Sequence, residues 1–127
     1  MLCPCHSQKP YAVCCKRFHS GTCTPDTALE LMRSRYSAYA LGLVQYIIDT
    51  TYKPVPRLKS EDIMAFCMST EFVGLEILDE DNSGLTSATV TFRAVLARDG
   101  KDASFQEKSH FVRVNGRWFF AEEKPVA

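Results

Sequence analysis

The sequence predicts an α+β fold, with a short cysteine-rich segment first, helices next and an antiparallel sheet last. Four of the six cysteines fall within the first fifteen of 127 residues. Apolar residues then recur at intervals of three and four, as on one face of a helix, and beyond residue 72 at intervals of two, as in a strand. Because helices and strands occupy separate stretches of the chain, alternating β–α–β units are excluded.

Composition places the chain among ordinary globular proteins. It is 46% hydrophobic and 24% charged, and its 15 basic and 15 acidic residues cancel. A neutral chain argues against nucleic-acid binding driven by overall charge. No apolar run approaches the roughly 20 residues that a membrane-spanning helix needs.

Charge divides the chain into two regions. Residues 1–23 carry Lys9, Lys16 and Arg17 and no acidic residue, whereas residues 24–127 carry a net charge of −3. We therefore expect a basic N-terminal module at 1–23 and a separate α+β domain at 24–127.

The N-terminal cysteines have the spacing of a metal site. Cys3 and Cys5 are followed, after eight residues, by Cys14 and Cys15. Zinc prefers four soft ligands in a tetrahedron, and four thiolates close it without leaving a position for water. The spacing predicts a structural zinc site, with His6 beside Cys5 and His19 four residues after Cys15 as alternative ligands.

Disulfides are the alternative use of these cysteines. No charged and apolar leader precedes them, so we expect a cytoplasmic, reducing environment in which thiols stay free. Of the other two, Cys23 is expected to be a spare thiol and Cys67 a small hydrophobic residue of a helix.

Two helices are expected before the sheet. Thr24, Pro25 and Asp26 have the cap, first-position proline and acidic first turn of a helix start. An apolar stripe follows, and Gly42 divides the helix in two. The stripe comprises Leu29, Met32, Tyr36, Tyr39 and Leu43. A further helix begins at Ser60 and buries Ile63, Phe66 and Cys67.

Four antiparallel strands are expected after residue 72. Val73, Leu75 and Ile77 share a face of the first, which ends at residues 81–84, and the second spans 88–96. The third runs from about residue 103 to 114, and Asn115-Gly116 is a favoured two-residue hairpin turn into the fourth, 117–122.

The cysteine segment resembles the SEC-C zinc motif, Cys-x-Cys-x8-Cys-[Cys/His], found at the C-terminus of the SecA translocation ATPase. Cys3, Cys5, Cys14 and Cys15 match its ligands, and Pro4, Ser7, Lys9 and Tyr11 match its other residues. His6 and Gln8 stand where glycines are usual, which makes positive φ angles less accessible. The resemblance implies zinc, and SecB or the ribosome as partners by analogy with the SecA tail.

Residues 31–36, 70–75 and 111–120 resemble the YchJ-type family of bacterial proteins, which pair a SEC-C motif with a nuclear-transport-factor-like, or cystatin-like and SnoaL-like, domain. This implies a cone of helices on a curved four-stranded antiparallel sheet, enclosing a pocket. Related folds often form homodimers through the sheet.

Within such a pocket we expect Arg33, Arg35, Tyr36 and His110 to bind a small molecule, with Tyr39 on the same stripe. No catalytic residue is assigned, because neither a Ser/His/Asp arrangement nor a phosphate-binding loop is present. The sequence favours a non-enzymatic binding or docking protein with a structural zinc knuckle. The alternative is a small-molecule-binding protein or an acid–base enzyme of the isomerase or dehydratase type.

Overall fold

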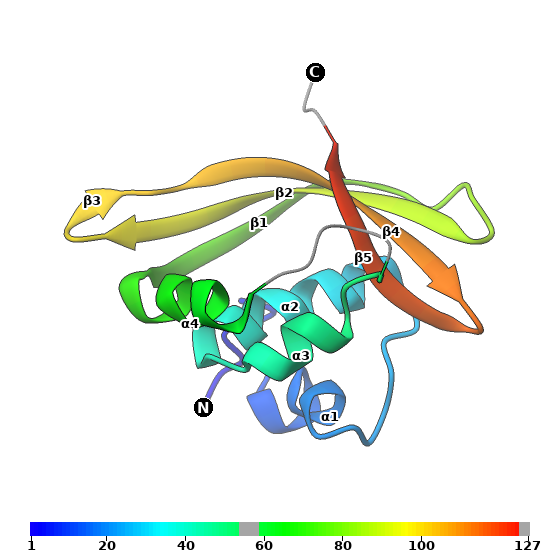
Figure 1. Ribbon diagram of the computed structural model, residues 1–127, viewed down its shortest axis with the longest axis horizontal. Coiled ribbons are helices and arrows are strands. Elements are labelled where there is room, and N and C mark those ends of the chain that lie inside the picture. The colour runs from blue at the N-terminus through cyan, green and yellow to red at the C-terminus, as the bar shows by residue number, and fades with distance from the viewer. Residues whose placement is uncertain (54–58, 125–127) are drawn as a thin grey trace.

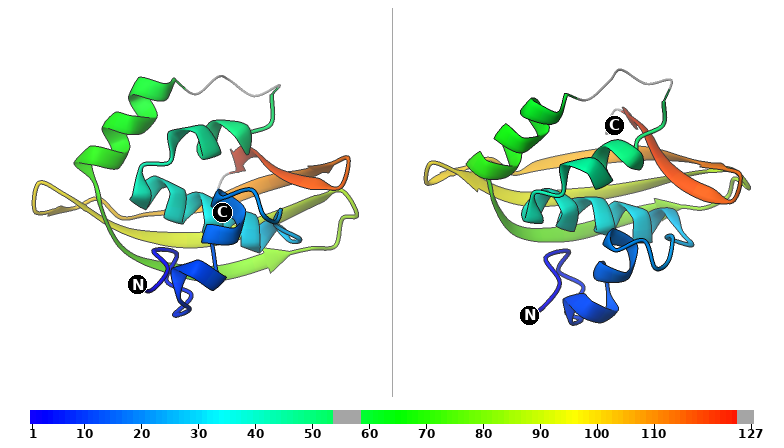
Figure 2. Two further views of the ribbon diagram at one scale, coloured as in Figure 1. Left: turned by 90° about the horizontal axis from the view of Figure 1, so that it is seen from below. Right: turned by 60° about the horizontal axis from the view of Figure 1, so that its bottom comes forward.

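The computed structural model describes residues 1–53 and 59–124. A twisted antiparallel sheet forms one layer and three helices cover one of its faces (Figure 1). The N-terminal module lies on the far side of the helices from the sheet (Figure 2). The expected α+β architecture is confirmed. In the described part of the chain, no helix is both long and apolar enough to span a membrane.

The N-terminal module is a loop closed on itself and followed by two short helical turns. These are η1 (Tyr11–Val13) and α1 (Lys16–His19). Leu2 forms an isolated bridge with Pro10, and the Cys3 backbone N–H donates to the Lys9 carbonyl at 2.8 Å. The loop therefore returns to its start, bringing the two cysteine pairs together.

The central helix α2 (Ala28–Leu41) starts three residues later than its sequence suggests. Thr27, not Thr24, is the N-cap, because its hydroxyl accepts from the Glu30 backbone N–H at 3.1 Å. The Glu30 carboxylate in turn accepts from the backbone N–H of Asp26 at 2.8 Å. The helix therefore starts at the Thr-x-x-Glu sequence of residues 27–30 and not at Thr24-Pro25.

Gly42 ends α2 in a left-handed conformation, φ 73°, as its position predicts. The short helix α3 (Val44–Asp49) follows, and α4 (Ser60–Ser69) begins at the expected serine. Of the three residues expected on its buried face, Ile63 is buried, whereas Phe66 and Cys67 are half-buried.

The sheet consists of β1 (Glu71–Asp81), β2 (Ser87–Arg98), β4 (Phe105–Val114) and β5 (Arg117–Lys124), hydrogen-bonded in the order β1-β2-β4-β5. All neighbours are antiparallel. The four expected strands are present, with one addition, the two-residue β3 (Lys101–Asp102), which pairs with the end of β2.

One residue of β1 lies on the opposite face from the one predicted. The register shifts between Phe72 and Gly74, so Val73 is an extra residue in the ladder and is 54% exposed. Phe72, Leu75 and Ile77 pack against the core instead. A β-bulge interrupts the two-residue alternation, which a strict period of two does not anticipate.

The main core lies between α2 and the concave face of the sheet. Leu31, Met32 and Tyr36 of α2 meet alternate residues of β2, and Phe111 of β4 completes the cluster. The buried residues of β2 are Ala88, Val90, Phe92, Ala94 and Leu96.

Candidate functional site

The four N-terminal cysteines form one compact cluster. The sulfur atoms of Cys3, Cys5, Cys14 and Cys15 all lie within 4.8 Å of one another, and the Cys5 and Cys14 sulfurs are 3.6 Å apart. Each side chain is at most 9% exposed. None of the six cysteines of the chain is in a disulfide.

These sulfur positions fit a tetrahedral metal ion. A Zn–S bond of about 2.3 Å places neighbouring sulfurs about 3.8 Å apart. The observed separations bracket that distance, so binding a metal requires only a small contraction of the cluster. Four thiolates would fill the coordination sphere and exclude water, which makes the site structural in character.

The thiols of the cluster interact strongly. Hydrogen bonding from the Cys15 side chain lowers the pKa of Cys5 to about 4, and burial opposes this. The hydrogen bond to Cys5 and burial raise the pKa of Cys15, and burial raises that of Cys3. One thiolate therefore forms readily, and a cation is needed to hold several together. Metal binding must then release protons.

Neither histidine of the module belongs to the cluster. Both ring nitrogens of His19 are engaged elsewhere: Nε2 donates to the Ser34 carbonyl at 2.8 Å, and Nδ1 accepts from the Tyr11 hydroxyl at 2.7 Å. The His6 ring lies edge-on to Tyr36, with 5.8 Å between centroids. The structure thus places four cysteines, without a histidine, at the candidate metal centre.

His6 and Gln8 adopt positive φ angles of 61° and 71°. These are the two positions at which the SEC-C motif usually has glycine. The loop keeps its left-handed geometry even though both residues carry a Cβ, a conformation that costs about 1 kcal/mol for an ordinary L-residue.

One side of α2 holds the module. Arg33 Nη1 donates to the Cys5 carbonyl at 2.9 Å, and His19 donates to the Ser34 carbonyl. The Ser37 hydroxyl lies 3.3 Å from His19 Nε2. Ser34 and Ser37 are fully buried although both are polar, because the module covers them. The candidate metal centre and the central helix are therefore one packed unit.

The opposite side of α2 borders a cavity of about 360 Å³ beneath the sheet. Met32, Arg35, Tyr36 and Tyr39 contribute from α2. The remaining walls are mostly aromatic and come from α4, β1, β2, β4 and β5: Ile63, Phe66, Phe72, Phe92, Ala94, Leu96, Phe105, Phe111 and Phe120, with polar Asp62, Glu107, Ser109 and Glu123.

Arg35 is buried at one end of this cavity, with 7% of its surface exposed. Its Nη1 donates to the Ile47 carbonyl at 3.0 Å and to the hydroxyls of Thr50 and Thr51 at 2.7 and 3.1 Å. The guanidinium lies over the Phe120 ring at 4.7 Å. Arg35 thus binds the C-terminal end of α3, where a cation is favoured by the helix dipole. Burial lowers its pKa.

Glu107 is the most buried carboxylate of the cavity. Ser109 donates a hydrogen bond to it, and no cationic side chain lies within ion-pair distance in the described residues. Burial raises its pKa, and the nearby charge of Glu123 adds to this. Glu107 is half-buried, and a carboxylate partly withdrawn from water without a paired cation is costly, so this position does not favour stability.

The four residues expected to bind a ligand do not come together. Arg35 and Tyr36 line the cavity, and Tyr36 donates to the Gly74 carbonyl at 2.8 Å. Arg33 lies on the module side of α2, because two residues along a helix correspond to about 200° of rotation.

His110 lies on the outer face of the sheet, because Ser109 and Phe111 on either side of it face the cavity. Its Nδ1 is 3.7 Å from Glu122. The cavity also contains Glu107, Ser109 and Glu123, which were not expected there from the sequence. The two-residue alternation from Phe105 to Phe111 along β4 is the signal that places Glu107 and Ser109 on the inner face.

Comparison with protein families gives one match. The family model described as "YchJ, middle NTF2-like domain" matches residues 27–123. A UPF0225 protein of Haemophilus influenzae, NTHI0386, is 38% identical over 121 residues, covering 94% of this chain and 75% of its own. The UPF0225 protein SCO1677 of Streptomyces coelicolor is 41% identical over 122 residues, which cover 94% of this chain and 92% of that protein.

Solved structures agree with this. A SEC-C motif-containing protein from Rhodopseudomonas palustris, RPA3114, superposes with a TM-score of 0.90 at 35% identity over the whole of both chains. Another SEC-C motif-containing protein, from Psychrobacter arcticus, gives a TM-score of 0.84 at 26% identity, covering all of this chain and 85% of that one. An NTF-2-like protein of unknown function from Shewanella oneidensis, 13% identical, shares the fold, with a TM-score of 0.53 over 74% of this chain and 95% of its own.

Proposed function

This chain belongs to the YchJ (UPF0225) family of SEC-C motif proteins, and we propose that it is a small-molecule-binding protein whose cavity is stabilised by a structural zinc ion. One observation carries the proposal: α2 is shared between the two sites. Arg33, Ser34 and Ser37 hold the cysteine module, while Met32, Arg35 and Tyr36 face the cavity.

Zinc is the metal that best suits this donor set. Four thiolates from one short loop are soft ligands in tetrahedral arrangement, and zinc favours such closed sites in proteins of a reducing compartment. Cys3, Cys5, Cys14 and Cys15 would hold the ion, which supplies the attraction needed to keep several thiolates together. The hydrogen bonds of Arg33 and His19 then hold the module against α2.

The cavity has the character of a ligand site. Its volume of about 360 Å³ falls within the usual range for small-molecule pockets, and its walls are mostly apolar with a few convergent polar groups. Arg35 and Glu107 both line the cavity, and the charge of each acts on the pKa of the other. A core designed only for packing would leave less space and fewer charges.

A cavity-filling substitution tests the proposal. Amide chemical shifts of the metal-loaded chain would be followed by NMR while 2-phenylethanol, 2-phenylethylamine and phenylacetate are added separately. At least one fragment should shift the amides of the cavity walls, and Ala94→Leu should abolish the response. Ala97→Leu, on the outer face of the same strand, should retain it. If no fragment shifts the wild-type amides, or if Ala94→Leu responds like wild type, the cavity is not the binding site.

A second candidate function is docking of the module on another protein. Leu2 and Val13 are 61% and 63% exposed, and the exposed basic residues Lys9, Lys16 and Arg17 lie in the same module. By analogy with the SecA tail, SecB and the ribosome are the partners to test. Leu2→Ser with Val13→Ser should reduce binding of either partner, whereas Leu85→Ser, at a remote and 92% exposed position, should not. Absence of wild-type binding to both partners would refute docking on them.

A further inference from the structure

The charges that line the cavity are predominantly negative. Among the described residues, Arg35 is the one cationic side chain in the lining, and Asp62, Glu107 and Glu123 are the acidic ones. Lys59 precedes α4 and is exposed, and it is not part of the lining. Among the described lining residues, carboxylates therefore outnumber cations.

The arginine is already engaged by the protein. Nη1 of Arg35 makes three hydrogen bonds to groups at the end of α3, and its guanidinium is stacked on Phe120. These contacts hold the side chain against one wall. The charge of Arg35 lowers the pKa of Glu107 from a distance, because no ion pair within 4.0 Å joins the two side chains.

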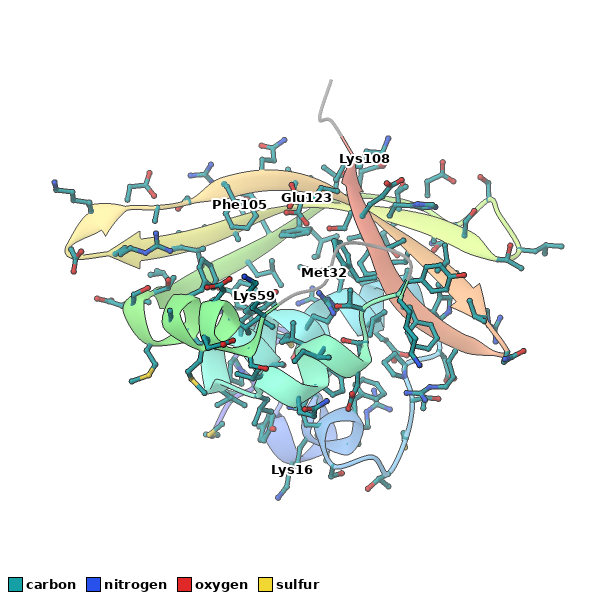
Figure 3. All side chains as sticks on the ribbon, in the orientation of Figure 1. Lys16, Met32, Lys59, Phe105, Lys108 and Glu123 are labelled. Atoms are coloured by element: carbon teal, nitrogen blue, oxygen red, sulfur yellow. The ribbon has the colours of Figure 1, made fainter. Side chains whose placement is uncertain are left out.

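Two of the three carboxylates belong to the sheet. Glu107, half-buried on β4, and Glu123, exposed on β5, both line the cavity, and the charge of Glu123 adds to the rise in the pKa of Glu107. Figure 3 labels Phe105 of β4, Glu123 of β5 and Met32 of α2; Lys108, next to Glu107, projects from the outer face of the sheet. Thus the neighbouring lysine of β4 does not neutralise Glu107 from within the cavity.

The apolar walls complement a cation. Phe66, Phe72, Phe92 and Phe105 belong to the lining, and adjacent rings meet edge to face, with centroids 5.9 Å apart for Phe66 and Phe72 and 6.2 Å for Phe92 and Phe105. The faces of aromatic rings attract organic cations, and the attraction is strongest where water is excluded. An anion of the same size would be repelled by the carboxylates.

We propose that the cavity takes a small organic cation, an amine with an apolar body, whose ammonium group binds at Glu107 and Glu123 between aromatic walls. This rests on the proposed function and names the class of its ligand. Glu107 provides the main counter-charge, since Ser109 already orients it.

Three probes of equal size and different charge test the class of ligand. 2-Phenylethylamine, 2-phenylethanol and phenylacetate would be titrated into the metal-loaded full chain at pH 7, with dissociation constants taken from calorimetry and NMR. We expect the amine to bind about tenfold more tightly than the alcohol, because a charge-assisted hydrogen bond is replaced by a neutral one. Phenylacetate should bind more weakly than either.

A matched pair of variants locates the effect. Glu107→Gln keeps the shape of the side chain and should bring the amine's affinity down about tenfold, to that of the alcohol, without changing the alcohol's affinity. Glu76→Gln removes the same charge from the outer face of β1 and should change neither. If Glu107→Gln lost affinity for the amine and the alcohol equally, the substitution would have changed the shape of the cavity, and the assignment of Glu107 as the counter-charge would be overturned.

The outcomes separate this proposal from the one on which it rests. If phenylacetate or the alcohol binds as well as the amine, the cavity remains a ligand site and the cation proposal is wrong. If none of the three binds, both proposals are wrong.

Discussion

Loss of the metal should destabilise the α+β domain as well as the module. The perturbation is Cys14→Ser, which removes one of the four sulfur ligands, and the matched control is Cys23→Ser, because Cys23 is exposed and outside the cluster. If the module detaches from α2, the bonds that join them are lost. The rest of α2 keeps its contacts with the sheet.

The magnitude follows from those bonds. The Arg33–Cys5 hydrogen bond, with a charged donor, contributes about 1.5 kcal/mol, and the His19–Ser34 bond about 1 kcal/mol. The edge-on contact of His19 with Tyr46, 4.8 Å between centroids, adds about 0.5 kcal/mol. The free energy of unfolding should fall by about 3 kcal/mol. With an unfolding entropy of about 2.1 cal/mol/K per residue, a chain of this length loses about 11 °C in Tm.

Differential scanning calorimetry, with metal content by mass spectrometry on the same samples, measures both quantities. Cys14→Ser should have little metal and a single transition about 11 °C below that of wild type, while Cys23→Ser should match wild type in both. A metal-free Cys14→Ser protein that unfolds at the wild-type temperature would refute the reasoning, because α2 would then be held without the module.

Three further variants probe other parts of the structure. Gln8→Gly relieves a positive φ and should tighten metal binding about fivefold in a chelator competition, whereas Lys9→Gly, where φ is not positive, should weaken it. Arg35→Met leaves acceptors at the end of α3 without their donor and should cost about 2 kcal/mol in urea unfolding; Arg93→Met, on the outer face of β2, should cost under about 0.5 kcal/mol. Burial raises the pKa of Glu107, so the folded state binds the extra proton and the free energy of unfolding should fall as pH rises from about 4.5 through the raised pKa. Glu107→Gln should flatten that fall and raise stability at pH 7; an unchanged pH profile would contradict the burial of an unpaired carboxylate.

Local sequence signals predicted much of the fold. Gly42 divided the first helical region because only a residue tolerant of left-handed geometry suits that helix end. Asn115-Gly116 fixed the last hairpin, and both residues have positive φ. The cysteine spacing brought four sulfurs together because the intervening loop closes between Leu2 and Pro10. Each of these depends on nearby residues alone.

The errors came where two local signals competed or where a distant strand decided the outcome. Thr24-Pro25 and Thr27-x-x-Glu30 are both typical of helix starts. In the second, the Thr27 hydroxyl accepts from the Glu30 N–H, and the Glu30 carboxylate accepts from the Asp26 N–H. The extra residue Val73 is set by pairing with β2, which a single strand's alternation does not show.

The cavity was the hardest part to foresee. Arg33 and Arg35 are too far apart around the helix to act together, and that could have been read from their spacing. Glu107 resembles a surface residue in the sequence, because a charged side chain on a strand is usually solvated. The alternation along β4 puts Glu107 on the same face as Phe111, but the pairing of β4 between β2 and β5 is what makes that face a wall of the cavity.

In the proposed function, one helix, α2, connects the candidate metal centre to the cavity. The most direct test is the affinity of 2-phenylethylamine for the metal-loaded chain and for the same chain after metal removal, with NMR spectra showing that the sheet remains folded. Removing the metal should weaken binding of the amine while the amides of β2 and β4 keep their shifts. Equal affinity with and without metal would show that α2 does not connect the two sites.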